Sequence, residues 1–318
     1  MDLVDAASYH QLALQAEGRS PATLRLYLLY ERRFLEFLEA RRLPPTLDAL
    51  NPLNARQAAL WFQTRKLGAR GGVVATATFL DTLKTWSSFL AREEVFPSGS
   101  PLQRVRRMRV QVLERQPYTR TEVHAMLDAC ERSRSPERDR LLVLLLLDSG
   151  CRIGEAAQLK VDDVRLDLRT VRVMGKGSRE RTIPIGVPQQ PDGGPLFRAY
   201  RAYLKVRERR IARTPERAGD HLLLTNAGYP LTAEGGTDVI KRLGDAAGVA
   251  DATAHRFRHT YATVYLTKYP GDETGLRRIL GHVSRDVLAT YVHLAQTSIA
   301  QRAGRVAPTG AWLHERDA

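Results

Sequence analysis

Residues 254–266 read Ala-His-Arg-Phe-Arg-His-Thr-Tyr-Ala-Thr-Val-Tyr-Leu, and Leu280-Gly281-His282 follows with Tyr291 nine positions beyond it. The first stretch predicts a helix that carries His255 and Arg258 three residues apart, so both lie on one face and reach the same group. The fold has to bring this face to the later tyrosine.

Two basic residues upstream complete a set of chemical groups. Arg152 follows a glycine turn, and Lys176 lies at the tip of a predicted β-hairpin. Two guanidiniums can hold both non-bridging oxygens of a phosphate, and a tyrosine can attack the phosphorus. The set predicts phosphodiester transfer through a tyrosine, with no metal and no cofactor. Its members are Arg152, Lys176, His255, Arg258, His282 and Tyr291.

Some of these residues also have ordinary explanations. An exposed arginine that caps a helix explains Arg152 by itself, and a helix-dipole carboxylate explains Glu155 nearly as well as a role in orienting a neighbour. His255 and His259 have a spacing that zinc sites use, but the metalloprotease glutamate and a third ligand are missing. We therefore predict no metal and expect His259 to support the site from behind. Tyr261 is expected to belong to the core.

The charge indicates a polyanionic partner. The chain has 49 Lys and Arg against 35 Asp and Glu in 318 residues, a net +14. Residues 1–115 hold 17 basic and 11 acidic residues, a net +6, and the remainder holds 32 and 24, a net +8. A protein from an arginine-rich proteome is the alternative. Charge in both halves favours a binder that grips its partner from two sides.

Cysteine usage and hydropathy predict a cytoplasmic protein. Cys130 and Cys151 form neither a disulfide framework nor a zinc pattern. The N-terminus lacks the layout of a signal peptide, and the longest apolar run, Leu141 to Leu147, is too short for a bilayer. We expect no membrane partner.

The fold class is predicted as mainly α (α+β). Residues 1–102 have apolar residues at helical spacing and predict a bundle of about four helices, starting from the cap Ser20-Pro21. Residues 103–118 form the predicted linker. Residues 119–318 form a mostly helical domain with a tail and a small antiparallel sheet, its hairpin strands at 170–174 and 181–185.

Six arginines are candidates for contacts with phosphates. A solvated basic surface is the alternative for each group. Three lie in the linker and three flank the hairpin tip: Arg104, Arg106 and Arg107, and Arg172, Arg179 and Arg181.

The order of these motifs resembles the signature of the tyrosine recombinases, the family of phage integrases and Xer recombinases. The resemblance rests on Gly150-Cys151-Arg152-Ile153-Gly154-Glu155, Lys176, His255-Arg256-Phe257-Arg258-His259-Thr260, Leu280-Gly281-His282 and Tyr291-Val292-His293. Each motif alone is weak, but five in this order form a strong signal. The resemblance implies that residues 1–102 are a core-binding domain and that the two domains close around double-stranded DNA.

The resemblance also implies the mechanism. Tyr291 would form a 3′-phosphotyrosyl intermediate, Lys176 would protonate the leaving 5′ oxygen, His255 would be the base or proton shuttle, and His282 would bind a non-bridging oxygen. Homo- or hetero-tetramers on paired sites, associated with the nucleoid, would exchange strands without ATP.

Two alternatives stay open: relaxation of DNA as by a type IB topoisomerase, and a non-catalytic architectural DNA-binding protein. Cys151, Gly154 and residues 285–289 depart from the Xer pattern, which puts the subgroup in doubt.

Overall fold

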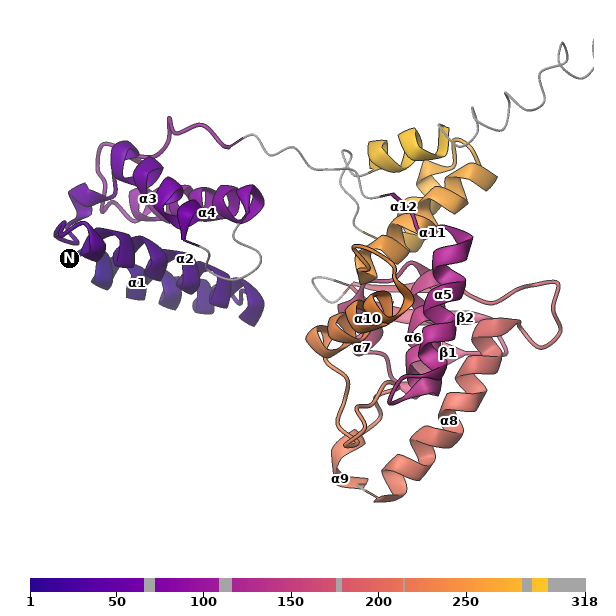
Figure 1. Cartoon of the computed structure of the whole chain (residues 1–318). Coiled ribbons are helices and arrows are strands. Elements are labelled where there is room, and N and C mark those ends of the chain that lie inside the picture. The colour runs from indigo at the N-terminus through magenta and orange to yellow at the C-terminus, as the bar shows by residue number, and fades with distance from the viewer. Residues whose placement is uncertain (66–71, 109–115, 176–178, 214, 282–287, 297–318) are drawn as a thin grey trace, which may run out of the picture. The chain divides into compact units, whose positions relative to one another are not determined.

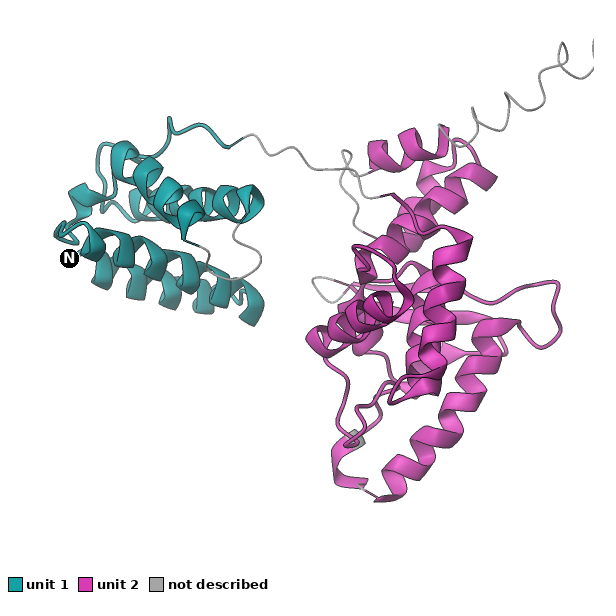
Figure 2. Cartoon of the chain, viewed as in Figure 1, with its two compact units in different colours: residues 1–113 teal, residues 114–318 magenta. Residues whose placement is uncertain are grey.

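The computed structural model describes residues 1–65, 72–108, 116–175, 179–213, 215–281 and 288–296. The chain divides into two compact units, residues 1–113 and 114–318 (Figure 2). Each unit has a hydrophobic core of its own. The described residues are mainly helical with one small antiparallel sheet (Figure 1), which confirms the predicted fold class.

The described part of the first unit is a bundle of α-helices. They are α1 (Leu3–Ala16), α2 (Pro21–Ala40), α3 (Pro52–Thr64) and α4 (Val73–Arg92), with the 3-10 turn η1 (Leu47–Ala49) before α3. The Ser20 side chain accepts a hydrogen bond from the Thr23 amide at the start of α2, as its sequence predicts. Phe34, Phe79 and Trp86 are fully buried between the helices. Replacing one of these aromatic residues by alanine lowers the free energy of unfolding by about 3–5 kcal/mol.

The second unit is built around the apolar helix α6. Its elements are α5 (Arg120–Glu131), α6 (Pro136–Ser149), α7 (Ile153–Ala157), η2 (Val161–Asp163), β1 (Val164–Arg165), β2 (Thr170–Met174), β3 (Glu180–Pro184), α8 (Pro195–Arg213), α9 (Pro215–Ala218), α10 (Ala233–Ala247), α11 (Ala254–Lys268), α12 (Glu273–Leu280) and a helix at 288–296. α6 packs against α5, α8 and α11, and Leu141 to Leu146 are all buried. This explains why the run is apolar on every side.

The sheet has the order β1-β2-β3 and is antiparallel throughout. β2 and β3 form the predicted hairpin, in which Val171 faces Ile183 and Met174 faces Glu180. The sequence did not predict β1, a strand of two residues. α7 packs against β2, and α12 packs against β3. The hairpin therefore links the two helices that lead into the candidate site.

A separate apolar cluster closes the end of this unit. It joins α11, α12 and the helix at 288–296 through Ala262, Leu276, Leu280 and Tyr291. Because these four residues are almost wholly buried, packing fixes the position of the candidate nucleophile.

Candidate active site

The end of α6 places Arg152. Gly150 ends the helix with φ +61°, a left-handed conformation that glycine adopts without strain. A Cβ at this position would lie 2.9 Å from Tyr261 and Leu280. The chain can therefore turn here, and Arg152 becomes the N-cap residue of α7.

Glu155 binds two arginines at once. Its Oε1 accepts hydrogen bonds from Arg152 Nη1 at 3.0 Å and Arg181 Nη1 at 2.9 Å. Its Oε2 accepts from the Arg152 backbone amide at 2.8 Å and Arg181 Nη2 at 2.7 Å. Burial raises the pKa of this carboxyl group, but the bonds from Arg181 and Arg152 outweigh burial and hold the pKa below its ordinary value.

Arg258 lies on α11 with a side chain that is 2% exposed. Its Nη1 donates to the Gly150 carbonyl at 3.1 Å, and its Nη2 donates to the Leu280 carbonyl at 2.9 Å. Burial, and then the charge of Arg152, lower the pKa of Arg258 to about 10. The guanidinium is still charged at neutral pH and is locked in one orientation.

Tyr291 is fully buried. Burial raises the pKa of its hydroxyl, while the positive charges of Arg258 and Arg152 lower it by a smaller amount. The structure thus brings Tyr291 into the electrostatic range of both arginines. The nearby Tyr261 packs against Gly150, and burial raises its pKa to about 12. Tyr261 is half-buried and packs against the core cluster of this end of the unit.

The two histidines of α11 lie close to each other, and one of them also lies close to the tyrosine. The rings of His255 and His259 are 4.7 Å apart, and the ring of His259 meets that of Tyr291 edge-on at 5.0 Å. His255 is exposed and Arg258 is buried. The ring of His259 therefore lies against the ring of the tyrosine.

Lys176 and His282 lie outside the described residues. Their chain neighbours Gly175 and Gly281 are described and both lie next to Arg181. A Cβ on Gly175 would be 3.3 Å from Arg181 Nη1, and a Cβ on Gly281 would be 3.2 Å from the same atom.

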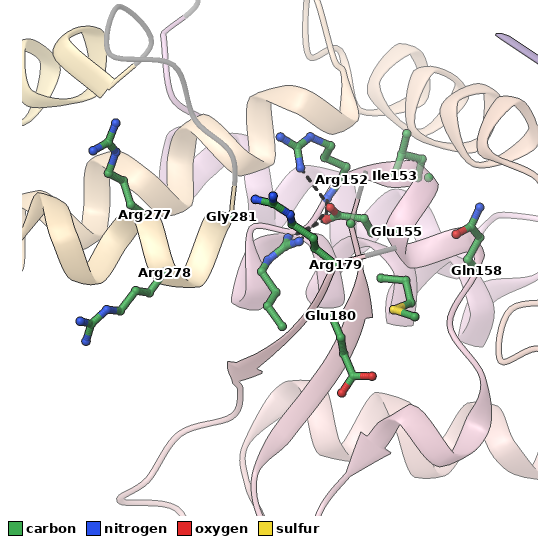
Figure 3. A pocket seen from close by; sticks show the side chains of 13 residues that line it. Arg152, Ile153, Glu155, Gln158, Arg179, Glu180, Arg277, Arg278 and Gly281 are labelled. Carbon is green, nitrogen blue, oxygen red and sulfur yellow. Dashed lines mark hydrogen bonds and ion pairs between the residues drawn. The ribbon is translucent and has the colours of Figure 1, made fainter. Parts of the chain in front are cut away.

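A cavity of about 1250 Å³ opens over this cluster (Figure 3). Its charged lining consists of Arg152, Arg179, Arg181, Arg277 and Arg278, with Glu155 and Glu180. Arg152 is hydrogen-bonded to Glu155, and Arg277 and Arg278 extend from helix α12. Arginine therefore exceeds carboxylate around the cavity, which suits a phosphate ligand.

Arg277 and Arg278 were missed in the sequence. They are exposed on the last turn of α12. The signal was present, since both residues directly precede Ile279 and the Leu280-Gly281-His282 motif in one predicted helix. A basic pair beside that motif indicates a phosphate contact as strongly as the basic run of the linker.

The six arginines proposed to contact phosphates differ in their surroundings. Arg104, Arg106 and Arg107 are exposed in the first unit, and Arg107 pairs with Asp81 at 3.2 Å. Arg172 is exposed and pairs with Asp163, and Arg179 is exposed at the cavity. Arg181 is different, because its side chain is only 13% exposed and is bound by Glu155.

The described residues offer neither a metal site nor a membrane span. In this part of the chain no three His, Cys, Asp or Glu side chains are grouped so that they could hold a metal ion. No described helix is long and apolar enough to cross a membrane.

Comparison with known proteins identifies the family. The model of the Phage integrase family matches residues 118–298. Tyrosine recombinase XerA of Thermococcus kodakarensis is 30% identical over 284 residues, which are 87% of this chain and 86% of the relative. Tyrosine recombinase XerC of Mycobacterium tuberculosis is 33% identical over 294 residues, 89% and 91% of the two chains. The chain belongs to the phage integrase family, and its class of enzyme is that of the tyrosine recombinases.

Solved structures share the fold. A lambda integrase dimer bound to a COC′ core site aligns with a TM-score of 0.68 and 17% identity, covering 92% of this chain and 77% of that one. The XerH site-specific recombinase bound to difH substrate aligns with a TM-score of 0.62 and 18% identity, covering 94% and 84%.

Proposed function

We propose that this tyrosine recombinase cleaves and rejoins DNA at specific sites with Tyr291 as its nucleophile. The observation that carries the proposal is that the buried Tyr291 hydroxyl lies within the electrostatic influence of Arg258 and Arg152, and that Arg152 lines an arginine-rich cavity. Two arginines aimed at one phosphate stabilise the negative charge that develops in the transition state.

The chemical step is a transesterification. The Tyr291 oxygen forms a bond to phosphorus, and the bond from phosphorus to the 5′ oxygen breaks. The tyrosine gives up its proton to a base, and the 5′ oxygen takes up a proton as it leaves. One phosphodiester replaces another, so a free 5′ hydroxyl can reverse the step without ATP.

The remaining groups take their roles from the family motif. Lys176 is the proposed acid for the leaving oxygen, His255 the proposed base or shuttle, and His282 a donor to a non-bridging oxygen. The contact of His259 with Tyr291 makes it the support of the nucleophile. Hydrogen bonds from Arg258 to two backbone carbonyls hold its charged guanidinium in position.

The partner is double-stranded DNA. Lambda integrase and XerH, which share the fold, were solved bound to DNA sites, and a lambda integrase tetramer was solved on a Holliday junction. We propose the same partner here, four protomers on two sites, and residues 1–102 as a core-binding domain joined through 103–118 to the catalytic domain. Such an enzyme works in the cytoplasm, at the nucleoid.

The test is covalent trapping on a nicked suicide substrate. Tyr291→Phe removes only the hydroxyl, so we expect near-normal DNA affinity and no covalent adduct. The matched control is Tyr261→Phe, which removes a hydroxyl from a ring that packs against the core cluster, and this variant should still form the adduct. Adduct formation should persist in EDTA, because arginines neutralise the phosphate. An adduct formed by Tyr291→Phe would place the nucleophile elsewhere.

The same assay separates the alternatives. A non-catalytic DNA-binding protein forms no adduct. A type IB topoisomerase relaxes supercoiled DNA as a monomer and rejoins the same strand. Exchange of strands between two labelled duplexes distinguishes the recombinase from the topoisomerase.

A further inference from the structure

Arg181 donates three hydrogen bonds to other parts of the protein. Its Nη1 and Nη2 donate to the two oxygens of Glu155 at 2.9 and 2.7 Å, and its Nε donates to the Ile279 carbonyl at 2.8 Å. All three nitrogens are therefore committed within the protein. Three of its five N–H groups are used in this way, and at 13% exposure the side chain is less open to a DNA phosphate than the exposed Arg172 and Arg179.

These bonds join three segments of the site. Arg181 lies on β3, Glu155 lies in the first turn of α7 behind Arg152, and Ile279 lies near the end of α12. The close approach of Gly175 and Gly281 to Arg181 brings in the residues that directly precede Lys176 and His282 in the chain. One side chain thus lies against the segments that contain Glu155, Gly175 and Ile279 to Gly281.

The charges suggest a more specific role. Glu155 is almost fully buried and ionised, since its pKa is held below the ordinary value. It accepts two hydrogen bonds from Arg152 and two from Arg181. With Arg181 present, the three groups carry a net charge of +1. Without Arg181, the carboxylate would neutralise Arg152 and remove the positive charge that the phosphate needs.

We propose that Arg181 is a positioning residue that fixes Glu155 and compensates its charge, so that the charge of Arg152 remains available to the scissile phosphate. The proposal rests on the proposed function and assigns one more residue a role at the same site. Arg181 acts through Glu155 and Arg152 and does not touch the DNA. In this respect it differs from Arg172 and Arg179, which are exposed.

The test compares a neutral and a charged replacement of Arg181. Arg181→Gln removes the charge, and Arg181→Lys keeps it. Single-turnover cleavage of a suicide substrate is measured against protein concentration, which separates the maximal rate from half-saturation. We expect Arg181→Gln to lower the maximal rate at least about tenfold, with half-saturation within about threefold of wild type, and Arg181→Lys to retain more of the rate. Thermal unfolding verifies that both variants fold.

A substrate with a neutral methylphosphonate at the scissile position provides the electrostatic readout. This substrate carries one negative charge less than the natural one. A site that lacks positive charge therefore loses less of its cleavage rate with this substrate than with the natural phosphate. The rate ratio of wild type to Arg181→Gln should shrink on this substrate. A fold defect would leave the ratio unchanged.

Arg198→Gln is the matched control. Arg198, on α8, forms an exposed ion pair with Asp192, and the loss of this pair should change neither measurement. A rise in half-saturation for Arg181→Gln with an unchanged maximal rate would show that Arg181 binds DNA, and an unchanged rate ratio would show that it does not tune Arg152. Either result overturns the proposal. Adduct formation by the wild-type protein tests the proposed function separately.

Discussion

Arg258 and Tyr291 share one buried environment, in which the uncharged form of each group is favoured. Burial lowers the pKa of Arg258 to about 10 and raises the pKa of Tyr291 above its ordinary value. At neutral pH the arginine still carries its charge and the tyrosine still carries its proton. The nucleophile therefore needs a base at the moment of attack, which is the task proposed for His255.

The two cysteines provide a prediction on pH. Burial raises the pKa of Cys130 to about 12 and of Cys151 to about 11, from the ordinary value of 9.0. In the unfolded chain both thiols ionise near pH 9, so the stability that they provide is complete below pH 9 and is lost as pH rises to 11 and 12. We expect the free energy of unfolding to be about 1–3 kcal/mol lower at pH 10 than at pH 8, as measured by urea denaturation.

The thiols provide their own control. Cys130→Ala should show a smaller loss between pH 8 and pH 10 than wild type, because one of the two ionising groups is absent. Both thiols should resist Ellman's reagent at pH 8 in the folded protein. Rapid labelling of both would contradict their burial.

At the scale of elements, the turn after α6 is the feature on which the site depends most. Gly150 lets the chain turn toward Arg152, and its carbonyl accepts a hydrogen bond from Arg258. The same turn therefore fixes both arginines. Gly248 ends α10 in the same left-handed conformation, with φ +67°, but its Cβ would meet nothing within 4 Å.

This difference gives a matched pair of variants. Gly248→Ala should cost only the left-handed backbone, about 1–2 kcal/mol. Gly150→Ala should cost that amount and a further 1–3 kcal/mol or so for the clash with Tyr261 and Leu280. Urea denaturation of the two variants measures the difference. Equal losses would show that the packing around Gly150 yields without cost.

Local signals in the sequence predicted the elements well. The cap at Ser20, the turn at Gly150 and the hairpin at 170–185 each depend on a few neighbouring residues, and the structure has all three. β1 was missed because two residues have no periodicity to detect. Its pairing with β2 comes from the tertiary fold.

The candidate site was harder to predict where it depends on contacts between distant elements. The order of the motifs assigned Arg152, Arg258 and Tyr291 to one site, and in the structure both arginines influence the pKa of the tyrosine. The internal bonds of Arg181 to Glu155 and Ile279 span 26 and 98 residues. No local pattern reports such bonds, so Arg181 looked like any other arginine of the hairpin.

At the scale of the whole molecule, the chain is two units with separate cores and similar charge. The core of the first unit runs from Leu3 to Val105, and the main core of the second runs from Tyr118 to Phe257. Residues 1–113 hold 16 basic and 10 acidic residues, a net +6, and residues 114–318 hold 33 and 25, a net +8. Each unit therefore has both the means to fold and the charge to bind DNA.

A fragment of residues 116–318 tests whether both units grip the same DNA. The affinity of a protein for DNA falls with salt by a slope of about 0.9 for each phosphate neutralised. If the first unit contributes phosphate contacts, the fragment should fold, bind DNA more weakly than the full chain and show a shallower dependence on salt. Fluorescence anisotropy with a labelled duplex between about 50 and 200 mM salt measures the slope. Residues 1–108 alone, expected to fold and bind weakly without specificity, are the control. An identical slope for the fragment and the full chain would show that the first unit makes no phosphate contacts. The proposal that both units bind the same DNA would then be wrong.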